Sequence, residues 1–297
     1  MRGVLTLAGE GTRMLPWTRG LRKEFLPLFD RSTQGPPVLK PVTHLVLEAL
    51  VAAGIDDVTL VVGAKNLEFV RQYFTIDPGF LRRHSDKADR LHETRRFYQT
   101  LRGLRLHFAV QSKPRGFGDA VLQAEPFIGP DGFLLHAADA ALVERHRGTL
   151  IARLGRLRAS EELDAVLLVR RVADPTRYGV VEGTSDGRFE GTPRLRVTGM
   201  EEKPKRPRSK WAATAVYAFS PRLFDGLKAV RRARHPAELE VTDAIQWLIG
   251  SGGRVAALVL RPSEGEWRSV GSPDGYLRAL KRTQAIARRP PAPDGTI

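Results

Sequence analysis

The chain has 297 residues and contains no cysteine. Disulfides, thiolate metal sites and cysteine nucleophiles are therefore excluded. Asparagine is almost as scarce, since Asn66 is the only one. The two shortages together fit the depletion of heat-labile residues in a thermophile, although a genome of biased composition would leave the same pattern.

Long apolar runs are also missing. No stretch approaches the roughly 18 apolar residues that a membrane span needs. The apolar segment Val4–Leu7 is too short for the core of a signal peptide and runs directly into a glycine turn. We therefore expect a soluble, cytoplasmic protein without a membrane partner.

Acidic residues are in the minority, with 33 Asp and Glu against 48 Lys and Arg, which gives a net charge of +15. A basic chain can bind nucleic acid, or it can carry an arginine-rich surface that serves anionic small molecules or nothing specific. Here the basic residues are scattered among acids, and no zinc finger, helix-turn-helix or aromatic RNA-binding signature accompanies them. We expect no specific nucleic-acid partner.

Strands and helices are expected to alternate in the first half of the chain, and hydrophobic residues make up 42% of the sequence, enough for a large core. The expected strands are Gly3–Ala8, Ile55–Val62, Leu104–Val110, Phe133–His136 and Asp164–Val172. The expected helices are Pro41–Ala53, which Gly54 ends, then Asn66–Phe74, Gly118–Ala124 and Leu150–Leu157.

Beyond residue 173 the pattern becomes richer in strands. Strands are expected at Tyr178–Glu182, Arg194–Met200, Trp211–Phe219 and Val255–Leu260, and helices at Thr242–Ile249 and Tyr276–Arg282. The alternation predicts an α/β fold, a Rossmann-like three-layer αβα domain with a central mixed, mostly parallel sheet. No linker separates two cores, so residues 1–282 are predicted to form one domain, with 283–297 as a mobile tail.

A glycine-rich turn, LAGEGTRMLP, follows the first expected strand. It is not a dinucleotide fingerprint, because Met14 replaces the third glycine of G-x-G-x-x-G, and Gly-Lys-Ser/Thr occurs nowhere in the chain. A plain structural turn would explain Gly9 and Gly11 but not the cations that follow. Arg13 offers a planar donor fork and Lys23 a compact charge, a combination that favours binding of a triphosphate.

Further motifs resemble one family. They are RKEFLPLF, VLKPVTHLVLEAL, QSKPRGFGDAVL, HAAD at 136–139, YGVVEG, EEKP at 201–204, ELEVTDAI and WRSVGSP. In this order and spacing the chain resembles the sugar-1-phosphate nucleotidyltransferases, most closely the bacterial and archaeal UTP–glucose-1-phosphate uridylyltransferases. The resemblance runs from about residue 1 to 282 and implies a nucleotide half at about 1–140 and a sugar half at about 141–282.

The resemblance implies roles for the nucleotide half. Gly9, Gly11, Thr12 and Arg13 would hold the triphosphate beside Ala8, and Lys23 would support the α-phosphate or the leaving pyrophosphate. Gln111 would read the base, while Gly116 and Gly118 would let the backbone pack against it. A surface position at a strand end is the alternative interpretation of Gln111.

The resemblance also implies a metal and a sugar site. Asp139 would bind Mg²⁺, although a helix cap or Asx-turn would explain the same aspartate. His136 is an unfavourable ligand beside it, because no second histidine has ligand spacing and Mg²⁺ prefers oxygen. On the sugar side, Glu202 would bind hydroxyls and Lys203 the sugar phosphate, with Gly179 and Glu182 beside the ring and Glu238 and Asp243 shaping the wall.

Three positions depart from the family pattern. Arg22 replaces a proline, which would add charge at the rim, and Lys210 replaces an asparagine near the sugar phosphate. Ser269 stands where the family usually has a second metal-binding aspartate, and a hydroxyl is a poor Mg²⁺ ligand. A less favoured alternative is that Glu264 or Glu266 supplies the second carboxylate in place of residue 269.

The resemblance implies an enzyme that transfers a nucleotidyl group from a nucleoside triphosphate to a sugar 1-phosphate and releases pyrophosphate, with Mg²⁺ as cofactor. UTP and glucose 1-phosphate are the first expectation; dTTP, or GTP with mannose 1-phosphate, is the nearest rival. A non-catalytic regulatory paralogue and a polyanion-binding protein are the alternatives from other classes. The oligomeric state is left open, with a homo-oligomer among the expected forms.

Overall fold

The computed structural model describes residues 1–32, 36–234 and 237–288, so positions 289–297 of the expected tail lie outside the described residues. Its main element is a nine-stranded sheet in the order β5-β4-β1-β6-β11-β8-β12-β10-β9. The strands are β1 (Arg2–Leu7), β4 (Asp57–Gly63), β5 (Arg105–Gln111), β6 (Phe133–Ala137), β8 (Ala165–Arg171), β9 (Gly179–Phe189), β10 (Thr192–Glu202), β11 (Trp211–Phe219) and β12 (Val255–Val259).

The expected mixed α/β fold is confirmed, but a mostly parallel sheet is not. Strands β5, β4, β1 and β6 pair in parallel, as β8 and β12 do. The pairings of β11 with β6, β8 and β9, and of β10 with β9 and β12, are antiparallel. Because β11 also contacts β9, the second part of the sheet is partly closed, a geometry that strand positions along a sequence do not reveal.

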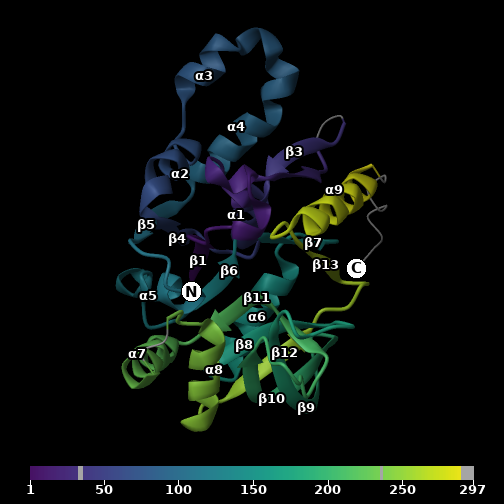
Figure 1. Cartoon of the computed structure of the whole chain (residues 1–297). Helices are drawn as coiled ribbons and strands as arrows, with labels where there is room; N and C mark the ends of the chain where they lie inside the picture. The colour runs from purple at the N-terminus through teal and green to yellow at the C-terminus, as the bar shows by residue number, and fades with distance from the viewer. Residues whose placement is uncertain (33–35, 235–236, 289–297) are drawn as a thin grey trace.

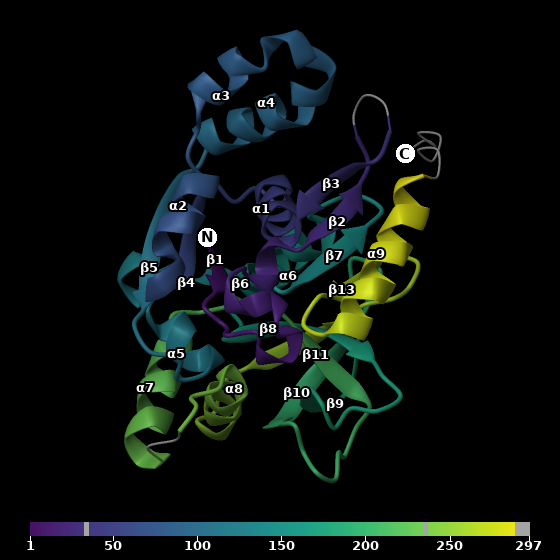
Figure 2. The same ribbon diagram turned by 45° about the horizontal axis from the view of Figure 1, so that its top comes forward.

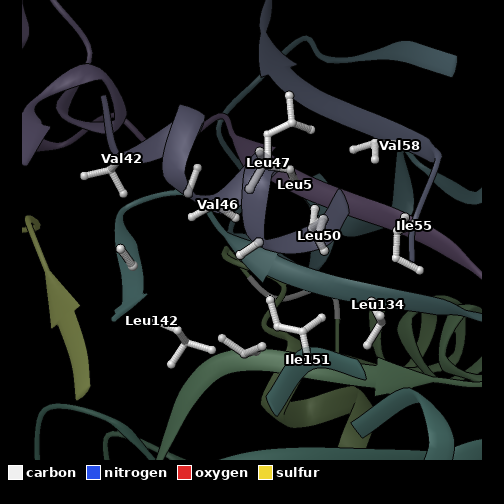
Figure 3. Packing of buried hydrophobic residues seen from close by; sticks show 14 of the residues in the cluster. Leu5, Val42, Val46, Leu47, Leu50, Ile55, Val58, Leu134, Leu142 and Ile151 are labelled. Carbon is white, nitrogen blue, oxygen red and sulfur yellow. The ribbon is translucent and has the colours of Figure 1, made fainter. Parts of the chain in front are cut away.

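Successive side chains of a strand point to opposite faces of the sheet, and a hydrophobic core lies against each face. In β1, Leu5 belongs to one core and Val4 to the other. The first core packs β1 and β6 against α1 (Val42–Ala52) and α6 (Thr149–Ser160), as Figure 3 shows for Leu47 and Ile151. Helices therefore lie against both faces of the sheet.

The second core lies under α5 (Phe117–Leu122), α7 (Arg222–Arg234) and α8 (Val241–Gly250). In Figure 1, α7 and α8 lie together at the lower left of the molecule, beside β8 and β10. Among the described residues, no helix combines the length and the apolar character needed to cross a membrane.

Several elements were not expected from the sequence. They are α3 (Pro78–Arg83), α4 (Ala88–Arg102), α7, the hairpin that pairs β2 (Pro27–Asp30) with β3 (Val38–Pro41), and the two-stranded sheet that pairs β7 (Ala140–Glu144) with β13 (Gly265–Ser269). Helices α3 and α4 project from the body beyond α2 (Leu67–Tyr73), as both views show (Figures 1 and 2). Charged residues interrupt the apolar periodicity of α3, α4 and α7, so the sequence pattern does not indicate these helices.

Helix ends follow local chemistry where the sequence predicts it. Helix α1 ends before Gly54, which takes φ 86°, a conformation that glycine adopts readily. Helix α9 (Pro273–Ala287) begins with the Ser272 hydroxyl accepting the Gly275 N–H, followed by a proline. It continues beyond residue 283, where the tail was expected to begin.

A buried ionic network ties the projecting helix α4 to the body. Lys40, only 5% exposed, lies 2.9 Å from both Asp30 and Glu48 and 3.2 Å from Glu93 of α4. Arg147 binds Asp30 and Glu48 from the other side. One lysine therefore balances carboxylates from the β2–β3 hairpin, α1 and α4.

Replacing Lys40 with methionine is expected to lower the free energy of unfolding by about 3–5 kcal/mol, because three carboxylates lose a buried counter-charge. The measurement is urea denaturation followed by circular dichroism. Lys65→Met, at an exposed position, is the control and should stay within about 0.5 kcal/mol of wild type. Equal denaturation midpoints for Lys40→Met and wild type would contradict a stabilising network.

Candidate active site

A cleft of about 490 Å³ opens at the carboxyl ends of the parallel strands β1, β5 and β6. Ligands of open α/β sheets bind at this edge, because the loops that leave the strands there are free to vary. Most of the residues that the sequence singles out line it, namely Ala8, Gly9, Gly11, Thr12, Arg13, Lys23, Gln111, Gly116, Asp139, Gly179, Glu202 and Lys203. Gly118, Glu182 and Ser269 are not among its lining residues.

The loop after β1 turns sharply at Gly11, whose φ of 69° favours glycine. A Cβ atom there would lie 2.9 Å from the Thr18 side chain. The Thr18 hydroxyl and the Met14 N–H both donate to the carbonyl of Gly11. The turn leads into Arg13, whose side chain reaches the cleft.

Arg22, one of the departures, has a structural role that the sequence did not show. Its guanidinium donates to the carbonyl of Leu7 at 2.9 Å and to that of Gly9. The side chain therefore braces the glycine loop from behind rather than adding free charge at the rim. Lys210, the second departure, is exposed and is not among the lining residues.

Lys23 and Asp139 form the central ion pair of the cleft. Lys23 Nζ donates to Asp139 Oδ2 at 2.6 Å, and both side chains are mostly buried. Burial alone would raise the pKa of Asp139, but the Lys23 ammonium, helped by Arg13, lowers it. The aspartate is therefore ionised and able to serve as an oxygen ligand.

Ser269 and this carboxylate both approach Gly271. A Cβ atom added to Gly271 would lie 3.3 Å from both Asp139 Oδ2 and Ser269 Oγ, and 3.1 Å from Arg13 Nη2. The serine hydroxyl accepts the N–H of Gly271 at 3.1 Å. Among the described residues, no group of three or more acidic, histidine or cysteine side chains could hold a metal ion.

This donor set fits Mg²⁺ only in part. One ionised carboxylate suits an ion that binds proteins through one or two carboxylates and keeps phosphates and waters as its other ligands. Glu264 and Glu266 are engaged elsewhere, since Arg153 and Arg261 bind the first, and Arg268 and Arg282 the second. Hydrogen bonds from Arg282 and Arg268 lower the pKa of Glu266 to about 2.

His136 does not join the cleft. Its side chain in β6 is buried, and Nδ1 lies 2.8 Å from the carbonyl of Ala137. Burial lowers the pKa of His136 to about 4, so the ring is neutral near pH 7.

Gln111, which the resemblance assigns to the base, ends β5 and is only 5% exposed. The two glycines nearby have structural tasks. A Cβ atom on Gly116 would lie 2.4 Å from the Leu239 carbonyl, and one on Gly118 would lie 2.9 Å from the same oxygen. Both glycines therefore let residues 238–240 approach α5, and only Gly116 lines the cleft.

Lys203, which the resemblance assigns to the sugar phosphate, takes an unusual backbone conformation with φ 44°. Its N–H donates to the Tyr178 carbonyl at 3.0 Å, and its ammonium lies 2.9 Å from Glu202. Such strain in a non-glycine residue is held by the surrounding structure and is frequent at functional sites. Gly179 lies opposite Glu202 in the β9–β10 ladder, whereas Glu182 lies 3.9 Å from Arg208.

The sequence missed other lining residues. Glu24, Tyr178, Glu240 and Trp267 line the cleft, as Glu238 does, whereas Asp243 is not among the lining residues. Burial and the neighbouring Glu202 raise the pKa of Glu240 to about 7. The spacing E-L-E could have indicated Glu240, because alternate residues of an extended segment share a face.

A larger hollow of about 860 Å³ lies elsewhere, between the β2–β3 hairpin, β7, β13 and α9. It holds none of the residues assigned to phosphate, base or sugar. Two of its basic side chains, Arg147 and Arg282, are already paired with carboxylates. The smaller cleft is the one that gathers the candidate residues.

Comparisons with known proteins agree on the family. The family model described as Nucleotidyl transferase matches residues 2–285. Glucose-1-phosphate thymidylyltransferase of Streptomyces griseus is 32% identical over 92% of this chain, which spans 63% of that protein, less than two thirds of its length. The protein of the same name from Neisseria meningitidis is 26% identical, over 96% of this chain and 83% of its own.

Solved structures share the fold. A UDP-glucose pyrophosphorylase complexed with UDP-glucose matches with a TM-score of 0.79 at 23% identity, covering 96% of this chain and 100% of the other. A UTP-bound UGPase from Acinetobacter baumannii gives 0.77 at 24% identity, covering 95% and 93%. With the family model matching nearly the whole length, the chain belongs to the nucleotidyl transferase family.

Proposed function

We propose that the protein transfers a nucleotidyl group from UTP to glucose 1-phosphate and releases pyrophosphate. The proposal rests on the set of residues that line one cleft. Arg13, Lys23 and Asp139 lie among its lining residues together with Glu202 and Lys203. A single cleft with cations from both parts of the sheet can hold two anionic substrates at once.

The reaction needs charge neutralisation and positioning. The sugar phosphate oxygen is already an anion, so it attacks the α-phosphorus without losing a proton, and pyrophosphate leaves in line. In the proposed arrangement, Arg13 and Lys23 neutralise the triphosphate and the leaving pyrophosphate. Lys203 positions the attacking phosphate, and the Glu202 carboxylate, paired with it, accepts hydrogen bonds from sugar hydroxyls.

Asp139 is the residue that would hold Mg²⁺, with the other ligands supplied by nucleotide phosphates and water. When bound, the ion would neutralise charge on the transferred group. The Lys23–Asp139 pair keeps both side chains in place before substrate arrives.

A dTTP-using enzyme is the second candidate, because the relatives described above are glucose-1-phosphate thymidylyltransferases. The test is pyrophosphate release across a panel of nucleoside triphosphates and sugar 1-phosphates with Mg²⁺. Release that needs both substrates and is fastest with UTP and glucose 1-phosphate supports the proposal, whereas a preference for dTTP supports the second candidate. No release with any pair would favour a non-catalytic nucleotide-sugar-binding paralogue.

Lys203→Ala is expected to reduce kcat by roughly 30- to 1000-fold, which corresponds to about 2–4 kcal/mol for one electrostatic donor. UTP binding, measured by calorimetry, should change much less, because Lys203 is assigned to the other substrate. Lys205→Ala, two residues along the same loop and outside the cleft lining, is the control. Unchanged kcat in Lys203→Ala would refute the assignment.

Ser269→Asp is expected to lower the Mg²⁺ concentration for half-maximal pyrophosphate release, because a second carboxylate would stand beside Asp139. Asp139→Ala should nearly abolish release. Ser263→Asp adds the same charge at an exposed position outside the cleft lining and should leave the Mg²⁺ titration unchanged. If the Mg²⁺ titration of Ser269→Asp matched that of wild type, position 269 would not face the metal.

A further inference from the structure

The Gln111 side chain is held in one orientation. Its amide nitrogen Nε2 lies 2.8 Å from Asp119 Oδ2 and 3.2 Å from the carbonyl oxygen of Gly116. Both partners are acceptors, so only the NH₂ end of the amide can face them. The carbonyl oxygen Oε1 forms the other end of the amide, and no described residue donates a hydrogen bond to it.

Asp119 is the partner that decides this orientation. It lies on α5, is 9% exposed and is not among the residues that line the cleft. Its hydrogen bond to Gln111 is buried, where an acceptor facing an acceptor is unfavourable. A flipped Gln111 amide would place Oε1 against the Asp119 carboxylate and the Gly116 carbonyl. Each of these two contacts between acceptors disfavours the flip.

We infer that Asp119 is a positioning residue that makes the base site select nucleobases with a ring N–H. This inference rests on the proposed function, in which the Gln111 side of the cleft holds the base. Uracil and thymine carry such an N–H at N3 and guanine at N1, whereas cytosine and adenine present ring acceptors at the matching positions. An acceptor at Oε1 pairs with the first group and opposes the second.

The first test measures binding of UMP, dTMP, GMP, CMP and AMP to the wild-type protein by calorimetry. The three keto nucleotides should bind at least about tenfold more tightly than CMP and AMP, because an unpaired buried acceptor weakens binding. Binding is measured without turnover, so base preference is tested even if the proposed reaction fails. Equal or tighter binding of CMP would overturn the inference.

The second test uses Asp119 itself. Asp119→Leu removes the acceptor and frees the Gln111 amide to turn, so the ratio of kcat/KM for UTP over CTP should fall at least about tenfold. Asp119→Asn keeps one acceptor oxygen and should hold the ratio within about threefold of wild type. Gln123→Leu, at the C-cap of the same helix, removes a hydrogen bond to the Asp119 carbonyl and is the packing control.

A purely structural role for Asp119 would lower the rates with UTP and CTP in parallel and leave the ratio unchanged, which would overturn the inference. Asp119→Ala replaces the leucine variant if that chain does not fold. The same fall in the UTP to CTP ratio is expected there, and a wild-type ratio in a folded Asp119→Ala protein would equally refute the role.

Discussion

The ion pair between Lys23 and Asp139 is the interaction on which the rest of the cleft depends. The two residues are 116 positions apart in the sequence and meet at 2.6 Å. The pair joins the segment that follows β1 to the loop that follows β6, and it lowers the pKa of the aspartate despite burial. The glycine turn, the Arg22 brace and the Ser269 hydroxyl are all arranged around it.

This part of the site was accessible to sequence reasoning because its residues sit at fixed offsets from strong strand signals. Gly11, Arg13 and Lys23 follow β1, and Asp139 follows β6, so the parallel pairing of these strands brings them to one edge. Glu182 shows the limit of such reasoning. It shares a motif with Gly179, but it lies three residues further along β9, so its side chain points to the other face of the β9–β10 ladder, where it lies 3.9 Å from Arg208.

The parts that escaped prediction depend on tertiary contacts. The partly closed second half of the sheet arises from the contact of β11 with β9, which no local pattern encodes. Helix α4 is strongly charged, and its place is fixed partly by Glu93 reaching Lys40. The roles of Gly116 and Gly118 emerge only once residues 238–240 are seen to pack against α5.

The central claim is that one cleft holds both substrates for direct attack on the α-phosphorus. The attacking phosphate oxygen is already an anion, so the proposed reaction needs no nucleophile from the protein; the chain has no cysteine, and His136 is buried and does not line the cleft. The most direct measurement is the configuration at phosphorus after transfer from one diastereomer of UTPαS to glucose 1-phosphate, read by phosphorus NMR. The account predicts inversion, the result of a single in-line displacement; retention would reveal a covalent enzyme intermediate and contradict it.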